Sequence, residues 1–151
     1  MKLLLLLVTV PLFAADPSTF LLWKSADLQH YEKTLHAKVD QDHVANERLP
    51  DFAGHAVFVV HREGTGPVEA HDTVTHVIYV ISGEADLIVG GTMANEKRLA
   101  PEQLRGTSIT GGETKRVRAG DVMYIPPRAP HWFKVEMGRQ ITYLMLNLES
   151  H

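Results

Sequence analysis

From residue 55 onward the chain consists of short runs of β-branched and aromatic residues, each closed by glycine, proline or another turn residue. The run H-A-V-F-V-V-H-R at 55–62, for example, ends at the turn cluster E-G-T-G-P of residues 63–67. Short strands at regular spacing are typical of β-sandwiches and jelly-roll barrels. We therefore expect an all-β fold with strands at residues 55–62, 68–71, 76–81, 85–89, 108–110, 114–118, 122–125, 131–136 and 140–148.

Two parts of this region carry further expectations. Residues 92–106 are polar and lack a clear period, which predicts a surface loop. A glycine pair separates the runs at 108–110 and 114–118, which predicts a hairpin between them. A chain of 151 residues can bury one sizeable core and is too short for two comfortable ones. The sequence therefore predicts a single barrel domain over residues 55–148.

The first segment of the chain resembles an export signal. Residues 1–15 contain Lys2, an apolar run and then Ala14-Ala15, which is the pattern of a signal peptide cleaved after Ala14 or Ala15. The run is shorter than the roughly 20 apolar residues of a membrane helix. A buried N-terminal helix is the alternative. The signal peptide predicts a periplasmic or extracellular protein with no stable membrane insertion after cleavage.

Residues 16–54 are predicted to form a strand and helix extension in front of the barrel. The apolar run at 20–23 is interpreted as an edge strand. Residues 38–48 are polar and predict an irregular loop. Between them lies a predicted short helix with Ser25 as its N-cap and an apolar stripe of Leu28, Tyr31 and Leu35.

Charge and cysteine content exclude some classes of function. The formal net charge of −3 gives no general electrostatic reason to expect a nucleic-acid partner, and it leaves small polar or anionic ligands open. The chain contains no cysteine, which excludes disulfides, thiolate nucleophiles and cysteine-ligated zinc.

Three histidines and a carboxylate lie in two stretches of the predicted barrel. The first stretch, E-A-H-D-T-V-T-H-V-I-Y-V-I-S-G, begins at Glu69 and contains His71 and His76. The second, G-D-V-M-Y-I-P-P-R-A-P-H, ends at His131. Side chains alternate along a strand, so Glu69 and His71 share one face. Imidazole and carboxylate ligands suit a first-row divalent ion, and the spacing predicts a metal site.

These stretches resemble the two motifs of the cupin superfamily, whose fold is a double-stranded β-helix, and the resemblance covers about residues 55–148. Relative to the family pattern, Glu69 stands where the first histidine is expected and His76 stands where the acid is expected. In the second motif, Arg128 replaces a glycine. The resemblance implies a small secreted cupin that binds one divalent transition metal ion (Zn, Fe, Mn, Ni or Cu) through Glu69, His71, His76 and His131.

Several assignments leave alternatives. Glu69 is either a metal ligand, an acceptor that orients an imidazole, or the general base of catalysis. His76 is either a ligand or a hydrogen-bonded residue in a metal-free barrel. Arg128 is either solvated or contacts a substrate carboxylate.

Alternation along the strands also predicts the surroundings of the cavity. The residues that share a face with His76 or His131 are Ile78, Val80, Phe133 and Val135. The residues that either line the cavity or belong to the core are Met123, Tyr124, Tyr143 and Met145. Packing or rim positions are predicted for His55 and His61. Solvated positions are predicted for His30, His36, His43, Lys97, Arg98, Arg105, Lys115, Arg116 and Arg118.

The leading functional hypothesis is an exported, mononuclear metal-dependent cupin enzyme that acts on a small organic molecule as a dioxygenase, isomerase or lyase. The alternative is a non-catalytic cupin that binds a metal or a small ligand. A third interpretation is a metal-free structural domain. A homodimer formed through the N-terminal strand and helix is expected.

Overall fold

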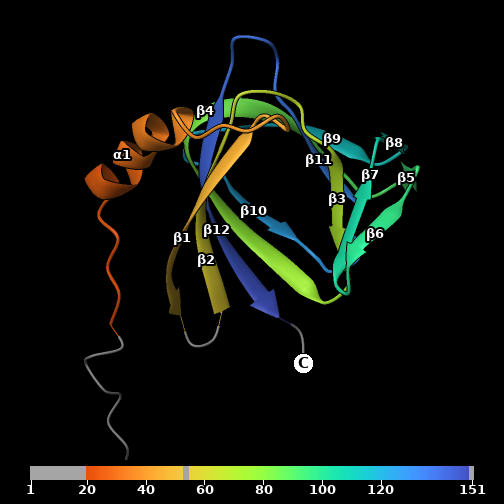
Figure 1. Cartoon of the computed structure of the whole chain (residues 1–151), viewed down its shortest axis with the longest axis horizontal. Helices are drawn as coiled ribbons and strands as arrows, with labels where there is room; N and C mark the ends of the chain where they lie inside the picture. Colours follow the sequence, from red (N-terminus) through yellow and green to blue (C-terminus); the bar gives the residue numbers. More distant parts are fainter. Residues whose placement is uncertain (1–19, 53–54, 150–151) are drawn as a thin grey trace, which may run out of the picture.

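A curled β-sheet forms most of the molecule (Figure 1). The computed structural model describes residues 20–52 and 55–149. Its elements are α1 (Ser25–His36), β1 (Val44–Phe52), β2 (His55–Arg62), β3 (Val68–His71), β4 (Val74–Val89), β5 (Thr92–Ala94), β6 (Lys97–Ala100), β7 (Gln103–Gly106), β8 (Ser108–Thr110), β9 (Glu113–Arg118), β10 (Val122–Ile125), β11 (His131–Lys134) and β12 (Ile141–Glu149).

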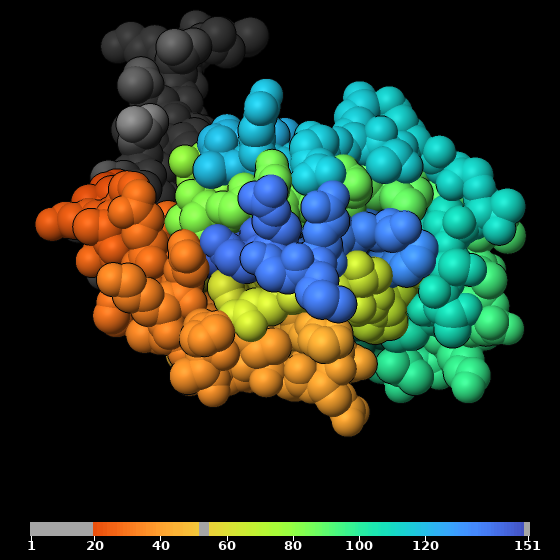
Figure 2. Space-filling model, turned by 90° about the horizontal axis from the view of Figure 1, so that it is seen from above, coloured from red at the N-terminus to blue at the C-terminus, as the bar shows by residue number. Residues whose placement is uncertain are grey.

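Antiparallel pairing joins the strands in the order β1-β2-β12-β4-β11-β3-β7-β6, and β9 and β10 also pair with β4. A separate two-stranded ribbon contains β5 and β8. Figure 2 shows α1 and β1, in orange, on the opposite side of this face from the green-to-cyan region of β5 to β8. The predicted all-β jelly-roll barrel with one short helix is confirmed.

Strand β4 is the longest element and runs through the position where the sequence predicted a turn. The separate strands expected at 76–81 and 85–89 are one strand of 16 residues. Gly83 lies within it at a φ of +74°, and a Cβ there would lie 2.0 Å from the carbonyl oxygen of Gln140. The N-terminal part of β4 pairs with β10 and β12, and the C-terminal part with β9 and β11. Gly83 therefore lets one strand serve both halves of the barrel.

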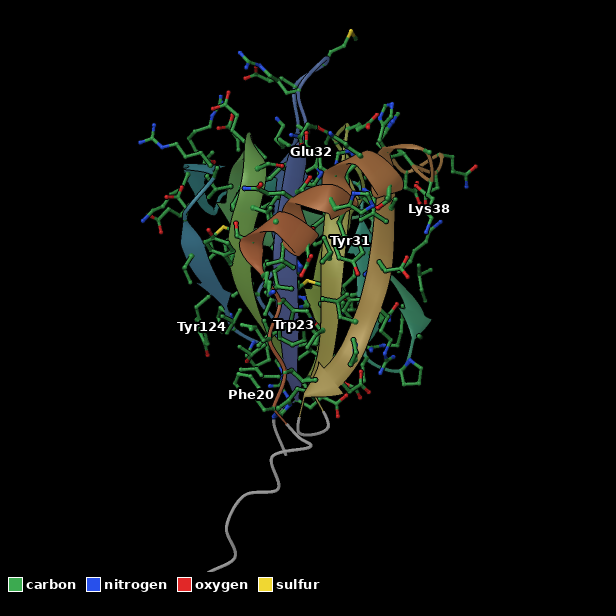
Figure 3. All side chains as sticks on the ribbon, turned by 90° about the vertical axis from the view of Figure 1, so that its left-hand side faces the viewer. Phe20, Trp23, Tyr31, Glu32, Lys38 and Tyr124 are labelled. Atoms are coloured by element: carbon green, nitrogen blue, oxygen red, sulfur yellow. The ribbon has the colours of Figure 1, made fainter. Side chains whose placement is uncertain are left out.

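Strand β2 separates two cores because its side chains alternate between its faces. On one face Val57 and Val59 are buried against Leu28 and Leu35 of α1. The helix lies across this outer face of the sheet, and Trp23 before the helix and Tyr31 within it pack against the same core (Figure 3). On the other face, Val60 belongs to the main core inside the barrel. The helix thus covers the sheet without entering the barrel.

The N-terminal extension differs from the sequence prediction in three ways. Residues 20–24 form neither helix nor strand, so the predicted edge strand is wrong. The helix is confirmed, but its N-cap is Lys24, one residue before Ser25, and no side chain caps it. The predicted loop at 38–48 contains the start of β1, which pairs with β2. Polar residues form this strand because β2 supplies the hydrogen-bonding edge.

Residues 92–110 were also predicted incorrectly in part. The expected loop at 92–106 contains β5, β6 and β7, and β7 pairs with β3 beside the site. The strands β8 and β9 do not form the expected hairpin, because β8 pairs with β5 and β9 with β4. The predicted signal peptide at 1–15 lies outside the described residues. No helix in the described part of the chain is long and apolar enough to cross a membrane.

Candidate metal centre

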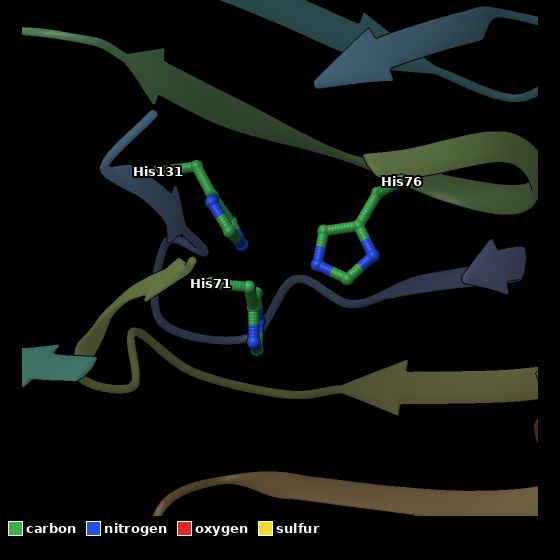
Figure 4. A group of neighbouring side chains, drawn as sticks. All are labelled: His71, His76 and His131. Carbon is green, nitrogen blue, oxygen red and sulfur yellow. The ribbon is translucent and has the colours of Figure 1, made fainter. Parts of the chain in front are cut away.

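Three histidines from three strands converge inside the barrel (Figure 4). His71 is the last residue of β3, His76 lies near the start of β4, and His131 is the first residue of β11. One ring nitrogen of each lies within 4.8 Å of the other two. The ring centroid of His71 lies 4.7 Å from that of His76 and 5.7 Å from that of His131, and the centroids of His76 and His131 are 5.2 Å apart. These three residues are called the three-histidine cluster below.

Hydrogen bonds fix the tautomers of two of these rings. Nδ1 of His76 donates to Oδ1 of Asn147 at 2.8 Å, and Nδ1 of His131 donates to the carbonyl oxygen of Ala129 at 3.0 Å. Because a carbonyl oxygen only accepts, each Nδ1 carries the proton of a neutral imidazole and Nε2 keeps its lone pair. A histidine that binds a metal through one ring nitrogen usually donates a hydrogen bond from the other ring nitrogen in this way.

Burial keeps the three rings neutral. Burial, followed by the proximity of His76, lowers the pKa of His71 to about 4. Burial likewise lowers the pKa of His131 to about 4 and lowers that of His76. A neutral imidazole is the form that binds a metal. The cluster therefore fits a first-row divalent ion in its number of donors, their type and their protonation.

Glu69 lies beside the cluster and is held by two arginines. It is the register partner of His131, and its Oε2 lies 3.8 Å from Nε2 of that ring. Its Oε1 accepts a hydrogen bond from Arg62 at 3.1 Å and lies 3.8 Å from Nη2 of Arg105. Burial raises the pKa of Glu69, but these arginines outweigh it and lower the pKa to about 2.

Two consequences follow for Glu69. It is not among the residues whose ligand atoms all lie within 4.8 Å of one another. A carboxylate with so low a pKa is a weak proton acceptor at neutral pH, which disfavours the general-base role and favours a fixed negative charge beside the imidazoles. The ligand, orienting and general-base roles of Glu69 all stay predictions.

Two members of the three-histidine cluster, His71 and His76, line a cavity of about 260 Å³. Its lining residues are Val44, Asn46, Phe58, Val60, Arg62, Glu69, His71, His76, Gln103, Arg105, Tyr143, Met145 and Asn147. Polar and charged side chains make up much of this lining, and convergent polar groups fix the orientation of a small molecule in a binding site.

Several of these residues were missed or misassigned by the sequence prediction. Arg105 was expected on a solvated face, but β7 pairs with β3 and brings its side chain to the cavity. Arg62 shares the inward face of Val60, and Asn147 shares that of Tyr143 and Met145. Alternation along the strands would therefore have been sufficient to predict that Arg62 and Asn147 face the cavity.

The predicted cavity surroundings are confirmed in part. Tyr143 and Met145 line the cavity, whereas Met123 packs against the main core. Tyr124 is 66% exposed, so its expected place in the cavity or core is wrong. The residues predicted to share the inward face of His76 or His131 are all in the main core: Ile78, Val80, Phe133 and Val135.

Arg128, which replaces a glycine of the family motif, keeps the backbone shape of a glycine. Its φ is +65°, in the left-handed region, and its N–H donates to the carbonyl oxygen of His71 at 2.7 Å. Its side chain is exposed. The residue therefore positions the backbone around His71.

A family model described as Cupin matches residues 37–142. The chain belongs to the cupin family. Among solved cupin structures, it is similar to oxalate oxidase, with 17% identity and a TM-score of 0.52 over 73% of this chain and 53% of that one. A cupin-2 domain protein from Rhodospirillum rubrum, Rru_A2000, has 15% identity and a TM-score of 0.51 over 72% of this cupin and 63% of that chain.

DMSP lyase DddQ from Ruegeria pomeroyi DSS-3 has 19% identity and a TM-score of 0.50, and the match covers 73% of this cupin and 50% of that chain. Each of these matches spans less than two thirds of the other protein. At such identities the likeness shows the fold. A comparison with curated proteins found no match.

Proposed function

We propose that this protein is a mononuclear metal-dependent cupin enzyme that acts on a small organic molecule. The observation that carries the proposal is the convergence of the three-histidine cluster beside a cavity that His71 and His76 line. Neutral imidazoles with fixed tautomers are prepared to bind an ion without prior loss of a proton. A bound ion supplies Lewis-acid or redox chemistry at this point.

The residues in and around the cluster have different proposed roles. His71, His76 and His131 would hold the ion, and the carboxylate of Glu69, which lies 3.8 Å from Nε2 of His131, would offset part of its positive charge. The apolar side chains of the cavity wall, among them Phe58 and Met145, would contact the carbon atoms of a substrate.

Arg105 indicates the class of substrate. Its side chain is 24% exposed and lies at the cavity wall, and its pairing with Glu69 is loose at 3.8 Å. Arg62, in contrast, is buried and donates to both Glu69 and Tyr143. Arg105 is therefore the cation that a substrate reaches, and a small carboxylate fits its planar donor pattern. The reaction is proposed to be a dioxygenation, an isomerisation or a lyase step.

Elemental analysis tests the metal. Untagged protein purified from its native compartment is compared with the H71A/H131A double variant and with H30A, which removes an exposed histidine of α1. Wild type and H30A are expected to contain about one ion per chain more than the double variant. Equal metal in all three proteins contradicts the site. Oxygen uptake and product analysis with small carboxylates then test turnover, and binding without turnover identifies a non-catalytic cupin.

Export and dimerisation belong to the same proposal. Mass spectrometry of protein from the native host is expected to find a mature chain that begins at Ala15 or Asp16. Phe20 and Leu22 are exposed apolar residues before α1, which supports a contact with a second copy. Light scattering is expected to give the dimer mass, and an intact N-terminus or a monomer mass contradicts the respective point.

A further inference from the structure

A second group of metal-ligand side chains lies at the end of the helix, outside the cavity. It contains His36, His61 and Glu63 and is called the helix-end cluster. His36 is the last residue of α1, His61 lies near the end of β2, and Glu63 follows β2. One ligand atom of each lies within 4.8 Å of the other two. His61 shares the helix-facing side of β2 with Val59, so it points away from the cavity.

Hydrogen bonds hold the ring of His61 beside a carboxylate. Nδ1 of His61 lies 2.8 Å from the hydroxyl oxygen of Thr142, and Nε2 lies 2.9 Å from Oε1 of Glu63. A divalent cation can take the place of the proton between Nε2 and the carboxylate.

His36 reaches the same carboxylate oxygen from the helix. Its Nδ1 contacts Oε1 of Glu63, so two ring nitrogens and a carboxylate meet at one place. The side chain of His61 is only 2% exposed, so the sheet holds its ring in place. Two imidazole nitrogens and a carboxylate oxygen form a donor set that suits a first-row divalent ion.

We propose that the helix-end cluster is a second transition-metal site, in which His36, His61 and Glu63 bind a first-row divalent ion such as Zn²⁺. The ion ties the C-terminal end of α1 to the barrel. Solvent or a small anion fills the remaining coordination positions, since His36 is 71% exposed.

The positions of the rings fit this assignment after a small movement. The centroids of His36 and His61 are 6.5 Å apart, somewhat more than the 4.7 to 5.7 Å of the three-histidine cluster. His61 and Glu63 are held by the sheet and by each other, whereas the ring of His36 is exposed at the helix end. Rotation of His36 therefore closes the site, and the ion stabilises the folded state by mass action.

Zinc titration tests this site independently of the first one. The H71A/H131A variant lacks two ligands of the first site, so after chelator treatment it is expected to bind about one Zn²⁺ per chain by calorimetry. Adding H36A or E63Q is expected to weaken that binding at least ~10-fold. Adding H30A removes an exposed histidine of the same helix and is expected to change nothing. Equal binding by the H36A and H30A versions overturns the proposal.

The same comparison in the otherwise wild-type chain covers the case that the double variant does not fold. There, wild type and H30A are expected to bind one more Zn²⁺ than H36A, whether or not the first site binds. Zn²⁺ is also expected to raise the melting temperature less in H36A than in H30A, because the helix is no longer tied to the barrel. Identical stoichiometry and identical shifts in H36A and H30A show that a proton occupies the cluster.

Discussion

Nδ1 of His76 and Oδ1 of Asn147 lie 2.8 Å apart across β4 and β12, where the two residues are register partners. This bond holds the His76 ring with Nε2 toward the three-histidine cluster. Replacing Asn147 by leucine removes the acceptor, so N147L is expected to weaken metal binding by roughly 10- to 100-fold. N147D keeps an acceptor and is expected to retain affinity. Chelator competition measures both, and equal affinity of N147L and wild type contradicts the assigned role.

The lowered pKa values of His71 and His131 predict a pH dependence of the metal-free protein. Their folded-state pKa of about 4 lies below the unfolded value of 6.5, so the unfolded state binds more protons between these pH values. Stability is therefore expected to fall as pH decreases from 6.5 to 4, by an amount on the order of 3 kcal/mol for each histidine.

Urea unfolding of chelator-treated protein across this pH range measures the effect. H71Q removes one of the titrating groups, so its stability is expected to fall less steeply with decreasing pH. A slope as steep as that of the wild type assigns the pH dependence to other groups.

Glu69 is expected to contribute to stability through Arg62. The side chain of Arg62 is 6% exposed and pairs with Glu69 at 3.1 Å, so E69Q leaves a buried guanidinium without its carboxylate. We expect E69Q to lower the free energy of unfolding by about 3 kcal/mol. The exposed pair of Arg48 and Asp51 gives a matched control, because D51N makes the same chemical change at the surface and is expected to have little effect. Equal losses contradict the structural role of Glu69.

Gly83 is expected to tolerate no side chain. Alanine there meets both a positive φ and a backbone oxygen at 2.0 Å, so G83A is expected to cost at least about 3 kcal/mol. Gly120 has a φ of +93° and open space around its Cβ position, so G120A is expected to cost only about 1 kcal/mol. Chemical denaturation of both variants separates the steric effect from the conformational one. Similar losses of unfolding free energy show that the backbone around Gln140 moves to accommodate the added methyl group.

Arg105 is expected to bind the carboxylate of a ligand. With oxalate as the probe and the metal-loaded protein, R105Q is expected to weaken binding about 10- to 100-fold, the effect of a lost charged hydrogen bond. R118Q changes an exposed arginine outside the cavity and serves as the control. Equal loss in both variants shows a general effect of net charge, and no loss in R105Q removes Arg105 from the substrate site.

The sequence identified the three-histidine cluster because His71, His76 and His131 match positions of the two cupin motifs, and the family fold brings these positions together. His71, His76 and His131 come from strands whose inward faces follow from neighbouring apolar residues. Arg105 was not found, because its place depends on the pairing of β7 with β3, and the sequence of β7 has no period of its own. Long-range pairing decides such positions.

The errors in the fold have the same origin. β1 and β6 are polar, and they become strands because a neighbouring strand offers unpaired backbone groups. Gly83 looked like a turn, since glycine after an apolar run usually ends a strand. Here a close approach of Gln140 requires the glycine, which no local pattern reveals.

The continuity of β4 has a consequence for how the protein unfolds. Because one strand pairs with β9, β10, β11 and β12, we expect the half of the barrel that carries His76 to unfold together with the other half. Backbone amides of β4 are therefore expected to exchange with solvent only through global unfolding. A protease in the cell would meet either the intact barrel or the whole unfolded chain.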